Sequence, residues 1–350
     1  MEQWYQRVIS GEDAGLLPAL CRGGLAVASW FFGAAVALRG YAYDRRWRPS
    51  VHLGVPVISV GNLTTGGTGK TPTVIMIARQ LQELGRRPAV LTRGYRAPAG
   101  GLPDEVMVIQ EECPGVPVVI NPDRVAGGRE ALTRYQADVL LLDDGYQHRR
   151  LARDMNIVLV DATAPMGIPG LLPRGTWREP PTALRRADYI MLTRCEQIPQ
   201  ELAEVAANLL AQWISPRHIY QQYTQVVGLF DAAGNQVKPA GQRVIALAGI
   251  ANPDGFVNTL QAMGLCVSAG FWFDDHHHYD PPADFAAIRR GVAGRPIAAW
   301  VTTHKDWVKL RGAPAPAPLW HVRTQCRLEG VQSQLWRQAL AAVVSRANRA

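Results

Sequence analysis

A glycine-rich turn between an apolar strand and a helix gives this sequence its clearest chemistry. Residues 57–71 read VISVGNLTTGGTGKT, and glycines at this spacing let the backbone direct its N–H groups around phosphate oxygens. Lys70 can reach the β- and γ-phosphates of a nucleotide, and the Thr71 hydroxyl can bind Mg²⁺. A helix beginning here would direct its positive end at the same anion. We therefore expect a phosphate-binding loop for ATP and Mg²⁺.

The standard loop spacing has a glycine at position 64, where this chain has threonine. The strand-to-helix context of the motif is nevertheless the required one. The residues expected to bind the nucleotide are Thr64, Thr65, Gly66, Gly67, Thr68, Gly69, Lys70 and Thr71.

A second acidic element follows the loop by about 70 residues. The apolar stretch Val139–Leu142 ends in Asp143 and Asp144, as in a strand that delivers a carboxylate to the magnesium ion of a nucleotide. An apolar strand ending in aspartate is common, so the pattern gains its meaning from the loop before it. The expected metal ligands are Thr71, Asp143 and Asp144.

The composition is that of a globular protein with anionic partners. The chain has 350 residues, of which 47% are hydrophobic and 19% charged, and its formal net charge is +8. Five scattered cysteines without C-x-x-C spacing argue against a disulfide framework or a zinc site and fit a reducing cytoplasm.

An uncharged segment near the N-terminus, Gly23–Leu38, contains Trp30, Phe31 and Phe32 and is bracketed by arginines. As a helix it would be roughly 24 Å long, shorter than the ~30 Å hydrocarbon core of a bilayer. It lacks the features of a signal peptide. A buried core helix and a helix in the interface of an anionic membrane both remain open, and a full span is the less favoured alternative.

Elsewhere apolar strands alternate with amphipathic helices, which indicates an α/β fold with a parallel sheet of the P-loop NTPase type and helices on both faces. The expected strands are Pro88–Leu91, Val116–Ile120, Val139–Leu142, Ile157–Val160, Tyr189–Leu192, Val244–Ala248 and Ile297–Thr302. The expected helices are Thr73–Glu83, Arg124–Tyr135, Gln200–Ala211, Pro253–Met263 and Gly330–Arg349.

We expect two α/β domains. Residues 1–40 would form a membrane-associating helical region, 41–218 the P-loop core and 219–242 a β-hairpin linker around an Ala-Gly-Asn turn. Residues 243–328 would form a smaller α/β domain, and 329–350 a C-terminal helix without an assigned docking site.

Several motifs, taken together, resemble the tetraacyldisaccharide 4'-kinases of the lipid A pathway in Gram-negative bacteria. The resemblance covers about residues 15–310 and depends on the order and spacing of the motifs. They are the loop of residues 60–72, Arg93-Gly94-Tyr95, DDGYQH at 143–148 with LARD at 151–154, Leu171-Leu172-Pro173, Arg178-Glu179-Pro180 and DHHHY at 275–279.

The resemblance implies transfer of the γ-phosphoryl of ATP to the 4'-hydroxyl of an acylated glucosamine disaccharide 1-phosphate, giving lipid IVA. It also implies a peripheral or monotopic location at the cytoplasmic face of the inner membrane, on anionic lipid. We expect a monomer and no nucleic-acid partner.

The resemblance further implies that Asp104 is the general base, with His276 orienting it and relaying its proton from the second domain. This sequence has Pro103 and Val106 where the family pattern has glycine and proline. A solvated loop acid is the alternative for Asp104. A transition-metal site at residues 276–278 is the alternative for the histidines, although three successive residues do not share one face.

Other polar residues match positions near the acceptor or the phosphates. Glu179 could organise the site or pair with the neighbouring Arg178. Arg93 and Arg124 could instead form surface ion pairs. Thr303-His304-Lys305-Asp306 resembles a family T-E-K-D segment and could lie near the nucleotide. The proposed catalytic residues are Asp104, His276, Lys70 and Arg124, and the proposed substrate residues are Asn62, Arg93, Tyr95, Gln147, His148, Arg178 and Glu179.

Two other classes of protein compete with this interpretation. Membrane-associated partitioning ATPases share the G-G-x-G-K-T loop, but they place a lysine just before the glycine pair, where this chain has Thr65. A nucleic-acid ATPase would fit the positive charge, but the sequence has no basic stripe interleaved with aromatic residues.

Overall fold

The structure is a computed structural model that describes residues 2–94, 101–250, 252–274, 277–291, 296–315 and 317–346. The chain forms two compact units. Unit 1 comprises Met1–Arg93, Cys113–Thr224 and Cys326–Ala350, and unit 2 comprises Gly94–Glu112 and Gln225–Gln325. The sequence-based boundaries place residues 94–112 in the P-loop core, whereas the structure assigns Gly94–Glu112 to unit 2.

A parallel sheet forms the centre of unit 1, with the strand order β7-β6-β5-β1-β4-β2-β3. Strands β1 and β4 are buried along their whole length, as expected of inner strands in a parallel sheet. The strands are β1 (Val57–Asn62), β2 (Pro88–Thr92), β3 (Val118–Ile120), β4 (Val139–Leu142), β5 (Met155–Asp161), β6 (Tyr189–Thr193) and β7 (Ile219–Phe230).

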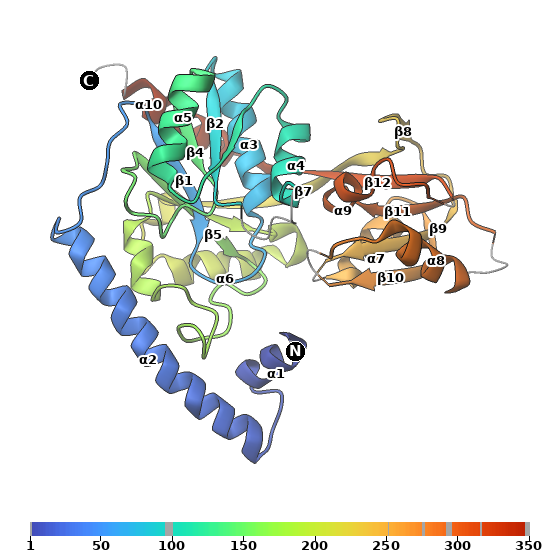
Figure 1. Cartoon of the computed structure of the whole chain (residues 1–350), viewed down its shortest axis with the longest axis horizontal. Coiled ribbons are helices and arrows are strands. Elements are labelled where there is room, and N and C mark those ends of the chain that lie inside the picture. The colour runs from blue at the N-terminus through green and yellow to red at the C-terminus, as the bar shows by residue number, and fades with distance from the viewer. Residues whose placement is uncertain are drawn as a thin grey trace. The chain divides into compact units, whose positions relative to one another are not determined.

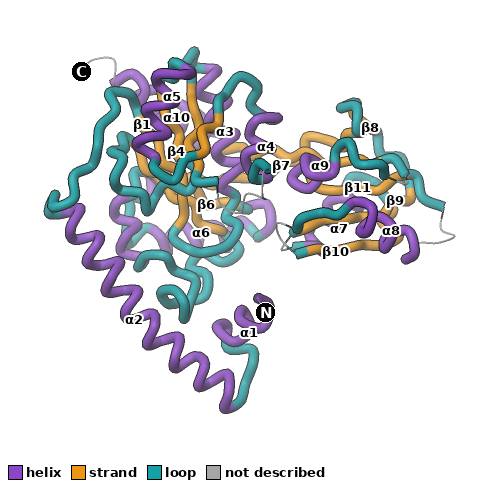
Figure 2. Tube along the Cα trace, in the orientation of Figure 1, coloured by secondary structure: helices purple, strands orange, loops and turns teal. Residues whose placement is uncertain are grey.

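Helices cover both faces of this sheet (Figure 2). Leu142 under α5 and Val158 under α6 share one face, because they align with Ser59 and Gly61 of β1. On the other face the Trp336 ring of α10 contacts Tyr189, and its indole N–H donates to Gln80 of α3 at 2.8 Å. The helices of unit 1 are α1 (Glu2–Ser10), α2 (Leu16–Asp44), α3 (Lys70–Glu83), α5 (Arg124–Tyr135), α6 (Gln200–Leu210) and α10 (Gly330–Arg346), with 3₁₀ turns at Pro181–Arg186, Cys195–Gln197 and Pro216–His218.

Helix α2 runs along the outside of unit 1 (Figure 1). It has 29 residues, about 44 Å of helix, and none of them is buried. The alternative of a buried core helix is therefore wrong. The helix extends beyond the uncharged run at both ends. In the described part of the chain it is the one helix whose length and mean hydropathy of 1.4 would allow it to cross a membrane.

One side of α2 contacts the segment 171–174. The Ser29 hydroxyl donates to the carbonyl of Leu171 at 2.7 Å and accepts from the N–H of Arg174 at 2.8 Å. A Cβ on Gly33 would lie 2.9 Å from a methyl group of Leu171, so glycine permits this close approach. Helix α1 adds the Tyr5 hydroxyl, which donates to the carbonyl of Pro173 at 2.6 Å.

A second, smaller α/β sheet forms unit 2, with the strand order β10-β9-β11-β12-β7. Helix α7 packs on one face through Phe256 and Leu260, and Phe285 of α8 contacts Trp300 on the other, with ring centroids 5.2 Å apart. Strands β7 and β12 each begin in one unit and end in the other. The elements are α4 (Asp104–Glu112), β8 (Gln236–Val237), β9 (Arg243–Gly249), α7 (Pro253–Ala262), β10 (Cys266–Phe273), α8 (Pro281–Gly291), β11 (Ala299–Thr303), α9 (His304–Leu310) and β12 (Leu319–Leu328).

The expected α/β fold, with a mostly parallel sheet and helices, is confirmed. Strand Val139–Leu142 and helix Arg124–Tyr135 have the predicted ends, and the other predicted elements shift by a few residues. The helix after the loop begins at Lys70, and Pro72 lies in its first turn, where a proline is tolerated. The predicted hairpin forms where β7 and β8 pair antiparallel, with Leu229 opposite Val237.

Candidate active site

The phosphate-loop segment connects β1, which ends at Asn62, to α3, which begins at Lys70. Gly66 and Gly69 have positive φ angles of 107° and 80°, a region that favours glycine. The N–H of Thr65 donates to the carbonyl of Thr176 at 2.7 Å, which holds the start of the loop to the segment 165–178. The loop therefore has the strand, turn and helix that its sequence predicts.

Lys70 lies at the centre of a charged cluster. Its Nζ is 3.3 Å from Oδ1 of Asn62 and 3.8 Å from Oδ1 of Asp144. Nη1 of Arg178 contacts both oxygens of Asp144, at 2.8 and 2.7 Å. Burial would raise the pKa of Asp144, but the charges of Lys70 and Arg178 outweigh it and hold the pKa below its ordinary value. Asp144 is thus a carboxylate between two cations at the mouth of the loop.

Asp143 and Arg124 form the buried layer behind this cluster. Asp143 follows β4 directly and is 6% exposed, and Arg124 at the start of α5 is 4% exposed. Arg124 donates to the carbonyl of Asn121 at 2.7 Å and to that of Asp143 at 3.3 Å. Burial lowers the pKa of Arg124, the carboxylates of Asp143 and Asp144 oppose this, and the charge of Arg93 lowers it further. Arg93 therefore lies within electrostatic reach of Arg124.

A tight turn after Asp144 brings the DDGYQH segment against β1. Asp144 has a φ of 49°, and a Cβ on Gly145 would lie 2.6 Å from Leu142 and 2.8 Å from the Ser59 hydroxyl. Only glycine fits this crossing. The turn directs Gln147 to β1, where its side-chain N–H₂ donates to the carbonyl of Asn62 at 2.9 Å.

His148 is neutral in this environment. Burial, together with the charges of Arg124 and Arg39, lowers the pKa of His148 to about 4. Its ring is therefore uncharged at pH 7 and can accept or donate a hydrogen bond without adding to the positive charge of the site.

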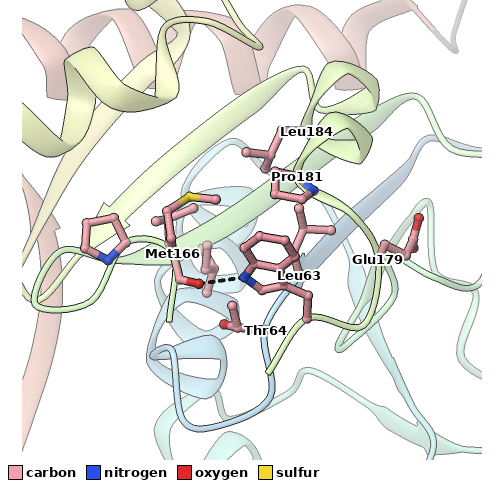
Figure 3. A pocket seen from close by; sticks show the side chains of 10 residues that line it. Leu63, Thr64, Met166, Glu179, Pro181 and Leu184 are labelled. Carbon is pink, nitrogen blue, oxygen red and sulfur yellow. Dashed lines mark hydrogen bonds between the residues drawn. The ribbon is translucent and has the colours of Figure 1, made fainter. Parts of the chain in front are cut away.

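Glu179 pairs with a different arginine from the one considered in the sequence. Its carboxylate lies 2.5 Å from Nη2 of Arg186, while the adjacent Arg178 binds Asp144. Glu179 also borders a mainly apolar pocket, whose wall includes Leu63 and Met166 (Figure 3). The alternative that Glu179 pairs with the neighbouring Arg178 is therefore wrong, because these consecutive residues reach different partners.

The residues around the loop fit a magnesium ion. Mg²⁺ prefers oxygen ligands, and the hydroxyl of Thr71 and the carboxylates of Asp143 and Asp144 are of this kind. The Oγ1 atom of Thr68 is buried and has no hydrogen-bond partner within the described residues, as expected of a loop that folds around a ligand.

Asp104 belongs to unit 2 and begins helix α4. It is 8% exposed, so the alternative of a solvated loop acid is wrong. Nζ of Lys305 and Nζ of Lys309 lie 3.7 and 3.6 Å from its Oδ2. Lys309 also lies 3.1 Å from Oδ1 of Asp306 and donates to the carbonyl of His277 at 3.3 Å. Lys309 therefore joins α4, α9 and the segment after β10.

The other end of α4 is held by basic residues of unit 2. Glu111 is bound by Arg323 at 3.0 Å and by Arg311 at 3.2 Å. Glu112 lies 3.3 Å from Nε2 of His304. Charged contacts at both ends thus fix the helix that carries Asp104.

Two of the predicted site residues, Tyr95 and His276, lie outside the described residues. His277 lies 3.1 Å from Asp284 and stacks on Phe273 with ring centroids 4.5 Å apart, and His278 is exposed. Within the described residues no group of three or more acidic, histidine or cysteine side chains could hold a metal ion.

The structure brings most of the predicted residues of unit 1 around Lys70 and Asp144, and it brings Asp104 together with two lysines in unit 2. Sequence reasoning missed Lys309 and gave Lys305 no defined role. Their spacing of four residues on a helix was the available signal, because it places both side chains on one face.

Known proteins are similar to this chain in sequence and in fold. A family model described as Tetraacyldisaccharide-1-P 4'-kinase matches residues 22–345. This chain belongs to that family. A relative from Anaeromyxobacter dehalogenans (strain 2CP-C), named tetraacyldisaccharide 4'-kinase, is 40% identical over 326 residues, which cover 87% of this chain and 86% of the relative. One of the same name from Syntrophus aciditrophicus (strain SB) is 43% identical over 319 residues, covering 82% and 83%.

The family also includes a solved structure of similar fold. The crystal structure of LpxK from Aquifex aeolicus in complex with ATP matches this chain with a TM-score of 0.73 and 28% identity, covering 93% of this chain and 99% of that one. Membership of this kinase family excludes the two alternatives, a partitioning ATPase and a nucleic-acid ATPase.

Proposed function

We propose that this chain transfers the γ-phosphoryl of ATP to the 4'-hydroxyl of tetraacyldisaccharide 1-phosphate, which gives lipid IVA. Family membership supports the reaction, and the cluster around Lys70 supports its mechanism. The observation that carries the proposal is a phosphate loop whose lysine contacts Asn62 and the ionised Asp144. An ammonium group in that position can bind the β- and γ-phosphates.

The loop N–H groups and Lys70 bind and orient the triphosphate, with Arg124 and Arg93 as further cations for the charge of the transferring group. Thr71, Asp143 and Asp144 would hold Mg²⁺. When bound, the ion would supply positive charge against the phosphate oxygens. Asn62, Gln147, His148, Arg178, Glu179 and Tyr95 are the proposed contacts to the acceptor.

Asp104 is the proposed general base. Its carboxylate takes the proton of the 4'-hydroxyl as that oxygen bonds to the γ-phosphorus. The bond between the γ-phosphorus and the β,γ-bridging oxygen breaks at the same time, and ADP leaves. Lys305 and Lys309 hold the Asp104 carboxylate in place, and His276 is the proposed residue that orients it and relays the proton.

Helix α2 is the proposed membrane contact. Its exposed side chains include Leu20, Val27, Trp30, Phe31 and Leu38, each more than 60% accessible. Such an apolar surface is unusual for a helix facing water, and the acylated substrate itself resides in a membrane. We propose that a monomer works at the cytoplasmic face of the inner membrane, with the arginines near α2 on anionic lipid.

A direct assay tests the activity. Purified protein is incubated with Mg²⁺, γ-labelled ATP and the disaccharide 1-phosphate, and the lipids are separated by thin-layer chromatography. We expect a labelled bisphosphorylated lipid. Lys70→Ala should reduce its rate of formation at least a hundredfold, because electrostatic stabilisation of the transferring group is lost. Lys238→Ala, which removes an exposed lysine, is the control. Near-normal turnover by Lys70→Ala would rule out the loop as the catalytic centre.

A further inference from the structure

Two residues at the end of β6 hold the carbonyl side of the phosphate loop. The Thr193 hydroxyl donates to the carbonyl of Thr68 at 3.1 Å, and Nη2 of Arg194 donates to the carbonyl of Gly67. A Cβ on Gly69 would lie 3.8 Å from Thr193, which is an ordinary van der Waals contact. Two consecutive peptide groups of the loop are thus fixed from the same side.

The geometry of the peptide bond then fixes the direction of the loop N–H groups. In a trans peptide the carbonyl of one residue and the N–H of the next point in opposite directions. Because the carbonyls of Gly67 and Thr68 are held by β6, the N–H groups of Thr68 and Gly69 are directed away from β6. A phosphate-binding loop requires N–H groups that face the ligand rather than the strand behind the loop.

Arg194 is itself anchored by an acid on the neighbouring strand. Its Nη1 lies 2.5 Å from Oδ2 of Asp161, the last residue of β5. The other oxygen of Asp161 accepts from the N–H and the hydroxyl of Thr163, at 3.0 and 2.7 Å. Arg194 adopts a left-handed backbone conformation with a φ of 60°, which is uncommon for arginine. The guanidinium therefore bridges a fixed carboxylate and the loop.

We propose that Arg194, anchored by Asp161, is a positioning residue that holds the phosphate loop in its nucleotide-binding form. The proposal deepens the proposed kinase function and rests on it, because it concerns the affinity of the same loop for a nucleoside triphosphate. Without this contact the Gly67 peptide can rotate, and the fraction of molecules with a competent loop falls. The apparent dissociation constant for the nucleotide then rises in inverse proportion to that fraction.

The experiment compares Arg194→Met, Arg194→Lys, Asp161→Asn and the double variant Arg194→Met/Asp161→Asn with the wild type. Arg134→Met is the matched control, since Arg134 forms an exposed ion pair with Glu130 on α5. The dissociation constant for ATP with Mg²⁺ is measured by calorimetry in the absence of lipid. The melting temperature with and without ATP, and the KM values for ATP and for the acceptor, are measured alongside.

Arg194→Met should weaken ATP binding roughly ten- to a hundredfold, the range for loss of a hydrogen bond from a charged donor. Asp161→Asn should act in the same direction and less strongly. The double variant should bind like Arg194→Met alone, because the two residues act as a unit. Arg194→Lys should restore part of the affinity, and the KM for the acceptor should stay unchanged.

Two results would overturn the proposal. One is an unchanged ATP affinity in both Arg194→Met and Asp161→Asn. The other is an equal loss of melting temperature with and without ATP, which would show that Arg194 only stabilises the fold. If instead the wild type binds no ATP, the proposed kinase function fails and this inference fails with it, so the two failures are distinguishable.

Discussion

Acidification should destabilise unit 2 through His321, a histidine of β12 with no exposed surface. Its ring stacks on Trp307, with centroids 4.2 Å apart, and its Nε2 accepts a hydrogen bond from Nε of Arg323 at 3.1 Å. The nearby His304 ring lies 5.1 Å away. Burial, followed by the charges of His304 and Arg323, lowers the pKa of His321 to about 3, although Asp231 acts in the opposite direction. Protonation of His321 at Nε2 would also place its N–H against the Nε–H of Arg323, so that two donors would face each other.

The size of the effect follows from linkage. A histidine in the unfolded chain has a pKa of about 6.5, so between pH 6.5 and pH 3 the unfolded state binds the proton more strongly than the folded state. Stability therefore falls as the pH falls through this window. At pH 5 the loss is about 2 kcal/mol, and at pH 3 it is about 4 kcal/mol. At pH 7.5 the contribution is negligible because both states carry a neutral ring.

Urea unfolding at pH 7.5 and pH 5.0 tests this reasoning, with tryptophan fluorescence as the signal because Trp307 stacks on His321. His321→Gln keeps an acceptor for Arg323 but does not titrate. The wild type should lose about 2 kcal/mol more than His321→Gln between the two pH values. His52→Gln, at an exposed position, should behave like the wild type. A parallel loss of stability in the wild type and His321→Gln would refute the assignment.

Three further predictions concern the base and the membrane helix. Asp104→Asn should lower kcat far more than it raises either KM, and a change confined to KM would place the base elsewhere. Lys309→Met should lower kcat and reduce the free energy of unfolding by about 3 kcal/mol, because it removes a cationic partner of the fully buried Asp306. Lys309→Arg should recover part of both losses. Wild-type kinetics and wild-type urea unfolding for Lys309→Met would show that this contact is unimportant. Glu in place of both Trp30 and Phe31 should release the protein from anionic vesicles in a sedimentation assay, and continued sedimentation would assign membrane binding to another surface.

Local patterns in the sequence determined the catalytic half of the fold. The strand before the loop, the glycines and Lys70 follow rules that act over a few residues, as do the apolar run and paired acids at 139–144. These rules predict which residues end a strand or begin a helix. Parallel strands then bring their carboxyl ends to one edge of the sheet, which is why Lys70 and Asp144 could be expected together.

Contacts between distant parts of the chain were decided only by the tertiary structure. Asp104 meets Lys305 and Lys309 about 200 residues later in the sequence, and no local periodicity reports such a pairing. Glu179 reaches Arg186 only seven residues later, but the turn at Pro181–Arg186 that lies between them has no helical or strand periodicity from which the pairing could be predicted. Helix α2 was ambiguous for a related reason, because an apolar helix in a core and one in a membrane have similar composition. The tertiary structure distinguishes the two cases, because the rest of unit 1 leaves every residue of α2 unburied.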